Sequence, residues 1–276
     1  MKSLLLLVAA VLAASAASAR AADLARPGSG VQRLARLEAP SARTHAAPGA
    51  TAAAANPCLT LLPNDPAGAA DDAQDWLRHG GGDPAAQCAA LARVALGDPG
   101  SGAASLDALA QQPHGATSWR ALLADEAAQA WLAAARPDRA LASSTLAVSL
   151  DPDDPALLTD RARAALAAGH PEQAVADLSR VLSAHPGQAE AQVVRATAYR
   201  RLGRIDAARA DIDAACTVLP DEPDALLERG ILRERFGDLD GARSDWSRIL
   251  SISPDTHEAD LAQQDLALLE VGPEAR

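Results

Sequence analysis

The sequence predicts an all-α fold in which helical hairpins stack into a solenoid. Its composition, a fixed period and regularly placed helix-breaking residues each support this prediction. Alanine makes up about a quarter of the 276 residues, whereas aromatic residues make up only 2%. Alanine has the highest helix propensity, while strands favour β-branched and aromatic residues, so the composition argues against an all-β fold. With 49% hydrophobic and 22% charged residues, the chain has the composition of a globular protein.

A repeat with a period of 34 residues runs through the second half of the chain. Proline, alanine, glycine, arginine and aspartate each recur at this step in a column of their own. Chance agreement in five independent columns is very improbable, so the repeat is genuine. The columns are Pro152, Pro186, Pro220 and Pro254; Ala140, Ala174, Ala208 and Ala242; Gly169, Gly203 and Gly237, with Ala135 in the first copy; Arg161, Arg195 and Arg229; and Asp177, Asp211 and Asp245.

Each repeat contains two amphipathic stretches, such as residues 156–168 and 171–184. A glycine breaks the chain between the two stretches, and a proline ends the second because proline cannot continue a helix interior. Each repeat is therefore predicted to form a helical hairpin, and neighbouring hairpins must stack because a single hairpin cannot bury its own apolar face. Within a hairpin we expect the recurring alanines to face small partners, namely Ala162, Ala196 and Gly230.

This pattern resembles the tetratricopeptide repeat, a family with the same period and with small residues, glycine and proline at these places. The resemblance implies a right-handed superhelical solenoid that binds proteins. Residues 257–270 would form its C-terminal capping helix, and residues 57–120 would form degenerate hairpins of the same superhelix. The four repeats would span residues 121–154, 155–188, 189–222 and 223–256.

The N-terminus has the layout of a secretory signal peptide. Lys2 precedes an apolar stretch, and small residues follow it. A membrane-spanning helix needs about 20 apolar residues, more than this stretch provides. We therefore expect residues 1–22 to be removed by cleavage near Ala19, Ala21 or Ala22, and residues 23–56 to form a disordered tether. The mature protein would be periplasmic or secreted and would have no integral membrane span.

Charge and motifs argue against several functional classes. The formal net charge is −11 and the only lysine is Lys2, whereas nucleic-acid binding requires clustered Lys and Arg. The sequence contains no GxSxG, P-loop or HExxH motif and no GxGxxG after a strand, so we expect no enzyme. The cysteines lack the spacing of metal ligands, so we expect neither a metal site nor a cofactor.

The arginine and aspartate columns lie sixteen residues apart, as in Arg161 and Asp177. One interpretation is a ladder of arginines that binds an acidic ligand. The other is one structural ion pair in each hairpin, which joins the first helix to the second. Because the pairs recur in step with the fold, the structural interpretation is favoured, and charge-to-charge distances below roughly 4 Å are expected.

Two of the three cysteines flank a predicted helix. Cys58 and Cys88 would come together if the chain folded back there, and an exported protein can form disulfides. A bridge between them and two free thiols both remain open at this point. Cys216 falls in the second helix of a repeat and is expected to be a small core residue.

The resemblance further implies that each first helix lines a concave groove for a partner peptide or helix. The sharper hypothesis is that an arginine cluster in this groove pairs with carboxylates of an extended partner, and the alternative is an ordinary solvated face. The expected groove residues are Asp125, Gln129, Thr159, Arg163, Val193, Thr197, Arg200, Arg201, Leu227, Ile231, Glu234 and Arg235, with the cluster at Arg200, Arg201 and Arg235.

Together these features predict a non-enzymatic adaptor or assembly scaffold of the cell envelope, whose partner is a protein. Two alternatives remain. The chain would be an accessory protein that binds an envelope glycan for an enzyme, which would require aromatic platforms in the groove. Otherwise it would be a structural protein that associates with itself through exposed helices. The sequence leaves the oligomeric state and the identity of the partner open.

Overall fold

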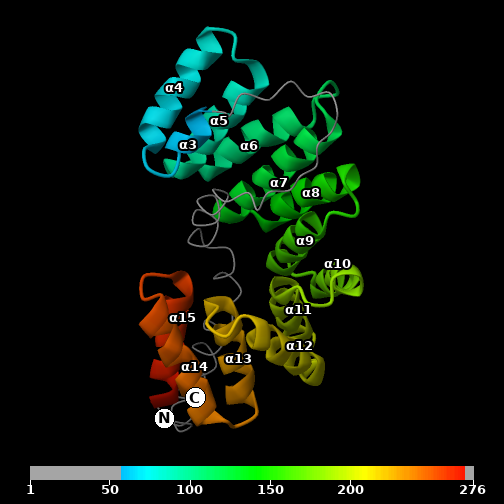
Figure 1. Ribbon diagram of the computed structural model, residues 1–276, viewed down its shortest axis with the longest axis vertical. Coiled ribbons are helices and arrows are strands. Elements are labelled where there is room, and N and C mark those ends of the chain that lie inside the picture. The colour runs from blue at the N-terminus through cyan, green and yellow to red at the C-terminus, as the bar shows by residue number, and fades with distance from the viewer. Residues whose placement is uncertain (1–56, 271–276) are drawn as a thin grey trace, which may run out of the picture. The chain divides into compact units, whose positions relative to one another are not determined.

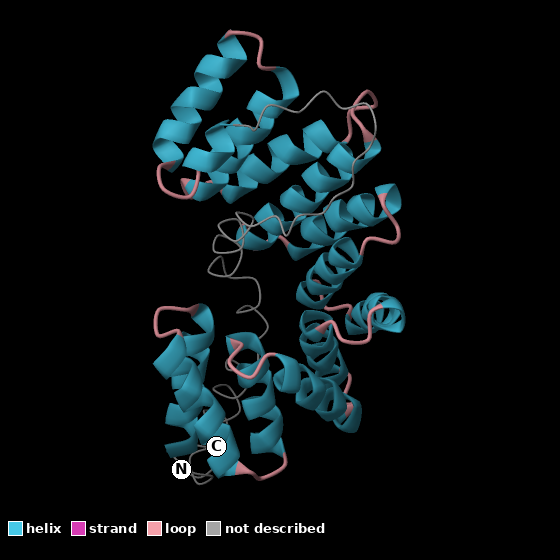
Figure 2. Ribbon diagram, viewed as in Figure 1, coloured by secondary structure: helices cyan, strands magenta, loops and turns pink. Residues whose placement is uncertain are grey.

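The computed structural model describes residues 57–270, which contain thirteen helices and no strands (Figures 1 and 2). These residues divide into an N-terminal unit, 57–160, and a C-terminal unit, 161–270, with the boundary inside one helix. The expected signal peptide and tether lie outside the described residues. Among the residues described, no helix combines the length and apolar character needed to cross a membrane.

Within each unit, helices that are neighbours in sequence pack against one another, which confirms the predicted all-α architecture of stacked hairpins (Figure 1). The N-terminal unit contains α3 (Pro57–Leu61), α4 (Pro66–Arg78), α5 (Gly82–Ala95), α6 (Pro99–Ala110), α7 (Thr117–Ala133), α8 (Pro137–Leu150) and the first six residues of α9 (Pro155–Ala167). The C-terminal unit contains the rest of α9, α10 (Pro171–Ala184), α11 (Ala189–Arg201), α12 (Ile205–Val218), α13 (Pro223–Arg235), α14 (Leu239–Ile252) and α15 (His257–Glu270).

Helix α7 differs from the other first helices of the repeats. It begins at Thr117, four residues before the expected start of the repeat at Ala121, and it is 17 residues long, whereas α9, α11 and α13 have 13. The short helix α3 was not expected from the sequence as a separate element. The expected capping segment, residues 257–270, coincides with α15.

Proline marks both ends of the repeating helices. The second helix of each repeat ends two residues before the proline of its column, as at Leu150 before Pro152 and Val218 before Pro220. Proline also occupies the first turn of several helices, where no intrahelical donor is lost. At α9, the Asp154 carboxylate accepts a hydrogen bond from the Ala156 amide at 2.7 Å and thereby caps the helix.

The glycine column lies in the turn between the two helices of a hairpin. Gly203 has a φ of +72°, and the next residue, Arg204, donates a hydrogen bond from its amide to the Tyr199 carbonyl at 2.8 Å. This bond closes the C-terminus of α11 and requires a left-handed residue, which glycine adopts without steric cost. The first hairpin has the same bond, from Arg136 to Trp131, but its left-handed residue is Ala135 with a φ of +54°.

The hydrophobic core is built mainly from alanine and a few larger side chains. Ala196, Ala208 and Ile212 are completely buried in one cluster, which joins α11, α12 and α13. Trp246 and Ile249 are completely buried in a second cluster, which joins α13, α14 and α15. Small side chains at helix contacts allow close approach of the backbones, which explains how so alanine-rich a chain forms a packed core.

Candidate interaction surface

The recurring arginine and aspartate form an ion pair inside each hairpin of the C-terminal unit. Each arginine on a first helix donates two hydrogen bonds to a buried aspartate on the second helix. The N–O distances are 2.5 and 2.8 Å for Arg161–Asp177, 2.7 and 2.8 Å for Arg195–Asp211, and 2.7 and 2.9 Å for Arg229–Asp245. These arginines are engaged within their own hairpins, in the geometry expected of structural pairs.

These ion pairs also affect the arginines themselves. The hydrogen bonds from Asp211 and Asp245 raise the pKa values of Arg195 and Arg229 despite their partial burial. Asp245 in addition accepts a hydrogen bond from Arg233 at 2.7 Å, so it holds two guanidinium groups. The column therefore fixes the register between paired helices and leaves no carboxylate or guanidinium of these pairs available to a ligand.

The expected groove residues of the N-terminal unit are turned inward. Thr159 is 2% exposed and donates its hydroxyl to the Pro155 carbonyl at 2.7 Å. Asp125 is 8% exposed, and its Oδ2 accepts a hydrogen bond from Gln129 at 2.8 Å. The expectation that Asp125 and Thr159 line an open groove is therefore wrong, because packing between neighbouring helices covers both side chains.

A second buried carboxylate lies beside Asp125 and was not singled out from the sequence. Glu126 is buried, and both of its oxygens accept hydrogen bonds from the amide of Gln87 on α5, at 2.9 and 2.8 Å. Burial raises the pKa of Glu126 to about 7, against the lowering effect of Gln87. Burial and the nearby Asp160 raise the pKa of Asp125 as well, and its Oδ1 has no hydrogen-bond partner within the described residues.

The apolar residues expected in the groove of the C-terminal unit belong to its core. Val193 is buried in the cluster formed by α11, α12 and α13. Leu227 and Ile231 are partly buried against the next cluster. Thr197 donates to the Glu228 carboxylate at 3.1 Å. The expectation of apolar patches on the groove is thus wrong for Val193, since first helices are covered on more than one side.

The charged groove residues differ in how they are neutralised. Arg163 pairs with Glu190 at 2.7 Å, and Arg200 pairs with Glu228 at 2.5 Å, so both ion pairs join successive first helices. Arg201 instead donates to the Leu166 carbonyl at 2.5 Å. Arg235 is exposed at the end of α13, next to the half-buried Glu234. The predicted cluster is therefore divided, because Arg200 already has an internal carboxylate.

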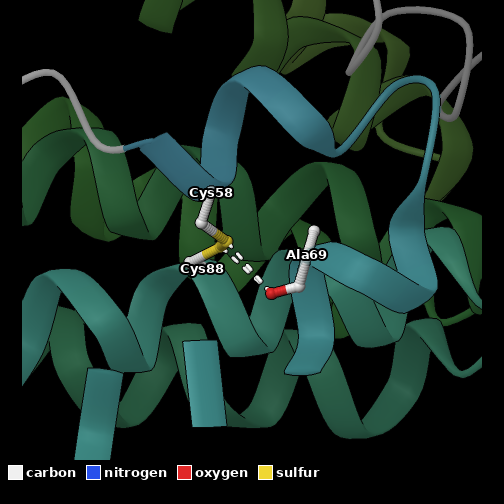
Figure 3. The surroundings of a disulfide bond; sticks show 3 residues. All are labelled: Cys58, Ala69 and Cys88. Carbon is white, nitrogen blue, oxygen red and sulfur yellow. Dashed lines mark hydrogen bonds between the residues drawn. A yellow bond between two sulfur atoms is a disulfide. The ribbon is translucent and has the colours of Figure 1, made fainter. Parts of the chain in front are cut away.

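The structure joins Cys58 of α3 and Cys88 of α5 in a disulfide, which lies against Ala69 of α4 (Figure 3). Both cysteines are buried, and the Cys58 sulfur lies 3.3 Å from the Ala69 carbonyl oxygen. The bridge ties the short α3 to α5 around α4. Cys216 is a buried free thiol, and burial raises its pKa.

Two shallow cavities occur among the described residues. One, of about 200 Å³, is lined by Arg209, Ile212 and Phe236, among others, and the guanidinium of Arg209 lies 5.2 Å from the centre of the Phe236 ring. The other, of about 280 Å³, is lined by Trp131 and Asp107, among others. Neither brings together a nucleophile and a base, and no group of His, Cys, Asp or Glu in the described part of the chain has a metal-binding arrangement.

Comparison with known proteins agrees with this architecture. A family model of the tetratricopeptide repeat matches residues 159–217 and 195–255. Among curated proteins, none matches this sequence. Solved structures with 16–20% identity share the fold. A thermophilic TPR protein of Thermus thermophilus has a TM-score of 0.53 and 20% identity, over 71% of this chain and 98% of that chain.

Two further solved structures share the fold over 75% of this chain. The pilF protein of Pseudomonas aeruginosa has a TM-score of 0.56 and 17% identity, with 94% of that chain covered. A chain of the APC/C hetero-tetramer Cut9–Hcn1 has a TM-score of 0.58 and 16% identity, with 41% of that chain covered. At these identities the likeness concerns the fold alone.

Proposed function

Because residues 159–255 of this chain are tetratricopeptide repeats, we propose that the protein is a non-enzymatic adaptor or scaffold that binds a partner protein along its first helices. The observation that carries this proposal is the repeated register of the hairpins. Ion pairs such as Arg200–Glu228 join one first helix to the next and set them side by side. A partner that follows these helices would meet the same helix positions again in each repeat.

We further propose that the adaptor works in the cell envelope, as a periplasmic or secreted protein. Two features support this location. The first is the signal-peptide pattern of residues 1–22. The second is the Cys58–Cys88 disulfide, because disulfides persist in oxidising compartments and are rare where glutathione keeps thiols reduced. Export can be tested directly by fractionating cells and determining the N-terminal residue of the mature chain.

Of the two alternatives, a glycan-binding accessory role has less support. Sugar platforms require accessible aromatic rings, whereas Trp131 and Trp246 are buried. Self-association through exposed helices is a separate structural alternative. Light scattering over a range of concentrations distinguishes it, since an adaptor that does not self-associate keeps one mass and a self-associating protein does not.

Site-specific photocrosslinking in intact cells tests the adaptor proposal. A photoreactive residue at Arg235 would stand at the end of α13, and one at Arg243 would stand on α14 of the same hairpin as the matched control. We expect position 235 to capture a discrete protein that position 243 does not. Capture only from position 243, or of nothing from either position, would contradict binding along the first helices. A product that contains only this chain would support self-association.

A further inference from the structure

Two arginine columns with the same step of 34 residues have different surroundings in the C-terminal unit. In the column of Arg195 and Arg229, each arginine holds a buried aspartate of its own hairpin. The second column consists of Arg201 and Arg235, in the last turns of α11 and α13. Within the described residues, no carboxylate lies within ion-pair distance of Arg201 or Arg235. The chain thus neutralises one arginine column and leaves the other without a counter-ion.

The neighbourhood of Arg201 explains why its charge stays uncompensated. Arg200, the preceding residue, occupies the Glu228 carboxylate with two hydrogen bonds, at 2.5 and 3.1 Å. Arg201 is half-buried and has one neutral acceptor, the Leu166 carbonyl. Burial and the charge of Arg200 lower the pKa of Arg201. A half-buried cation without a counter-ion is unfavourable, and a carboxylate brought by a ligand would relieve that cost.

A purely structural role accounts for only part of this arrangement. An arginine in the last turn of a helix interacts favourably with the helix dipole, typically by about 0.3–1 kcal/mol. That effect explains a cation at the ends of α11 and α13. It does not explain why a chain with 36 acidic residues places none of the described ones beside Arg201 or Arg235.

We propose that Arg201 and Arg235 bind the carboxylates of an acidic, extended segment of a partner protein that lies across α11 and α13. This inference rests on the proposed adaptor function and names the chemistry of the partner. The two helices are in contact, and packed helices lie about 8–10 Å apart. Three residues of polyproline II conformation span about 9 Å. Acidic residues at every third position would therefore reach both arginines from one face.

The charge of the chain argues for a peptide rather than a polyanion. The formal net charge of −11 repels a densely charged nucleic acid, and two guanidinium groups neutralise too few phosphates to overcome that repulsion. A few carboxylates, spaced to meet individual arginines, need only the local positive charge. Bidentate pairing between guanidinium and carboxylate would also define the direction and register of the bound segment.

The chain offers a matched control for this surface. Arg209 and Arg243 are also 34 residues apart and exposed, but they lie on the second helices α12 and α14. Replacing Arg201 and Arg235 with glutamate changes the net charge by the same amount as replacing Arg209 and Arg243. Circular dichroism and thermal unfolding of both double variants establish that each is folded. Substitution with glutamine (Arg201→Gln and Arg235→Gln) provides a milder pair if charge reversal prevents folding.

The experiment measures fluorescence anisotropy of labelled peptides with the full mature chain. The acidic probe carries glutamate at every third position, a neutral probe carries glutamine there, and a basic probe carries lysine. We expect the wild type to bind the acidic probe, more weakly as salt rises. The Arg201→Glu/Arg235→Glu variant should lose about tenfold or more in affinity, while Arg209→Glu/Arg243→Glu stays within about twofold.

Several outcomes would overturn the inference, and they separate it from the adaptor proposal. Equal loss in both double variants would mean non-specific attraction of charge. Binding of the neutral or basic probe alone would leave the adaptor proposal standing and refute an acidic partner. If the wild type captures a partner in the photocrosslinking experiment and Arg201→Glu/Arg235→Glu captures it equally well, the arginines are not the docking site. Arginine-dependent self-association in light scattering would identify a second copy as the occupant and refute the proposal.

Discussion

Gly230 of α13 lies directly against the indole ring of Trp246 of α14, so closely that a Cβ atom at position 230 would overlap the ring. The sequence predicted that Ala242 would face Gly230, whereas the atoms nearest to the missing Cβ belong to Trp246. One repeat earlier, the equivalent positions hold the smaller ring-free pair Ala196 and Ile212, both completely buried. The smallest residue of one column thus accompanies the largest residue of the other, which keeps the two helices at a similar separation.

Replacing Gly230 with alanine is therefore expected to destabilise the C-terminal unit, although alanine is the better helix former. Overpacking a core costs about 1–3 kcal/mol, which exceeds the gain of about 1 kcal/mol in helix propensity. Urea denaturation of Gly230→Ala measures this loss. The control is Gly100→Ala in α6, where a Cβ would meet nothing within 4 Å, so that variant should be neutral or more stable.

A double-mutant cycle isolates the contact with Trp246. Trp246→Leu alone should cost about 3–5 kcal/mol, because it leaves a cavity in a fully buried site. In the Trp246→Leu background, the added methyl group of Gly230→Ala should fill space and restore stability. A coupling free energy near zero would show that the cost of Gly230→Ala does not arise from the ring.

Ala135 is the one non-glycine residue with positive φ among the described residues, at +54°. Its equivalents in the next three hairpins are glycines with φ between +72° and +82°. The left-handed region costs an L-residue about 1–2 kcal/mol, part of which glycine gives back through the entropy of the unfolded chain. Ala135→Gly should therefore stabilise the N-terminal unit by about 0.5–1 kcal/mol in thermal unfolding. Gly203→Ala is the reverse control and should destabilise; the opposite signs would contradict this account.

The Cys58–Cys88 disulfide closes a loop over a sequence separation of 30 residues. Such a cross-link restricts the unfolded chain, and for this loop length the loss of chain entropy corresponds to a contribution of about 3–4 kcal/mol. Reduction should lower the unfolding temperature of the N-terminal unit, followed by fluorescence of Trp76 and Trp119. The Cys58→Ala/Cys88→Ala variant should begin at the lower temperature and show no response to reductant. A reductant effect that persists in this variant would assign the change to another cause.

The sequence predicted what recurs and missed what occurs once. The Arg161–Asp177 pair could be identified because both residues return at each step of 34. The Arg200–Glu228 and Gln87–Glu126 contacts join residues 28 and 39 positions apart and have no counterpart elsewhere among the described contacts, so no periodic signal revealed them.

The error at Val193 has a different physical cause. Helix α11 packs against α10, α12 and α13, so several of its sides are buried and its apolar residues are not confined to one stripe. Helical periodicity cannot distinguish a core position from a groove position on such a helix. The same ambiguity concealed Asp125 on α7, where buried residues also occur around the helix.

Glu126 makes the stability of the N-terminal unit dependent on pH. Burial raises its pKa in the folded state to about 7, above the ordinary value of 4.5 that applies when the chain is unfolded. The folded state therefore binds the proton more tightly than the unfolded state. This contribution to stability is fully present below pH 4.5 and is lost as the pH rises through 7, by up to about 3 kcal/mol.

Glu126→Gln removes the titrating group while keeping the size of the side chain and an amide contact to Gln87. Other carboxylates, including the buried Asp125, also titrate in this range, so the informative quantity is the difference between wild type and variant at each pH. We expect the variant to gain stability relative to the wild type as the pH rises from about 4.5 to about 8, measured by urea denaturation. Parallel curves for the two proteins would mean that Glu126 ionises in the folded state as readily as in the unfolded chain. Asp125→Asn should show a change of the same sign, since burial and Asp160 also raise the pKa of Asp125.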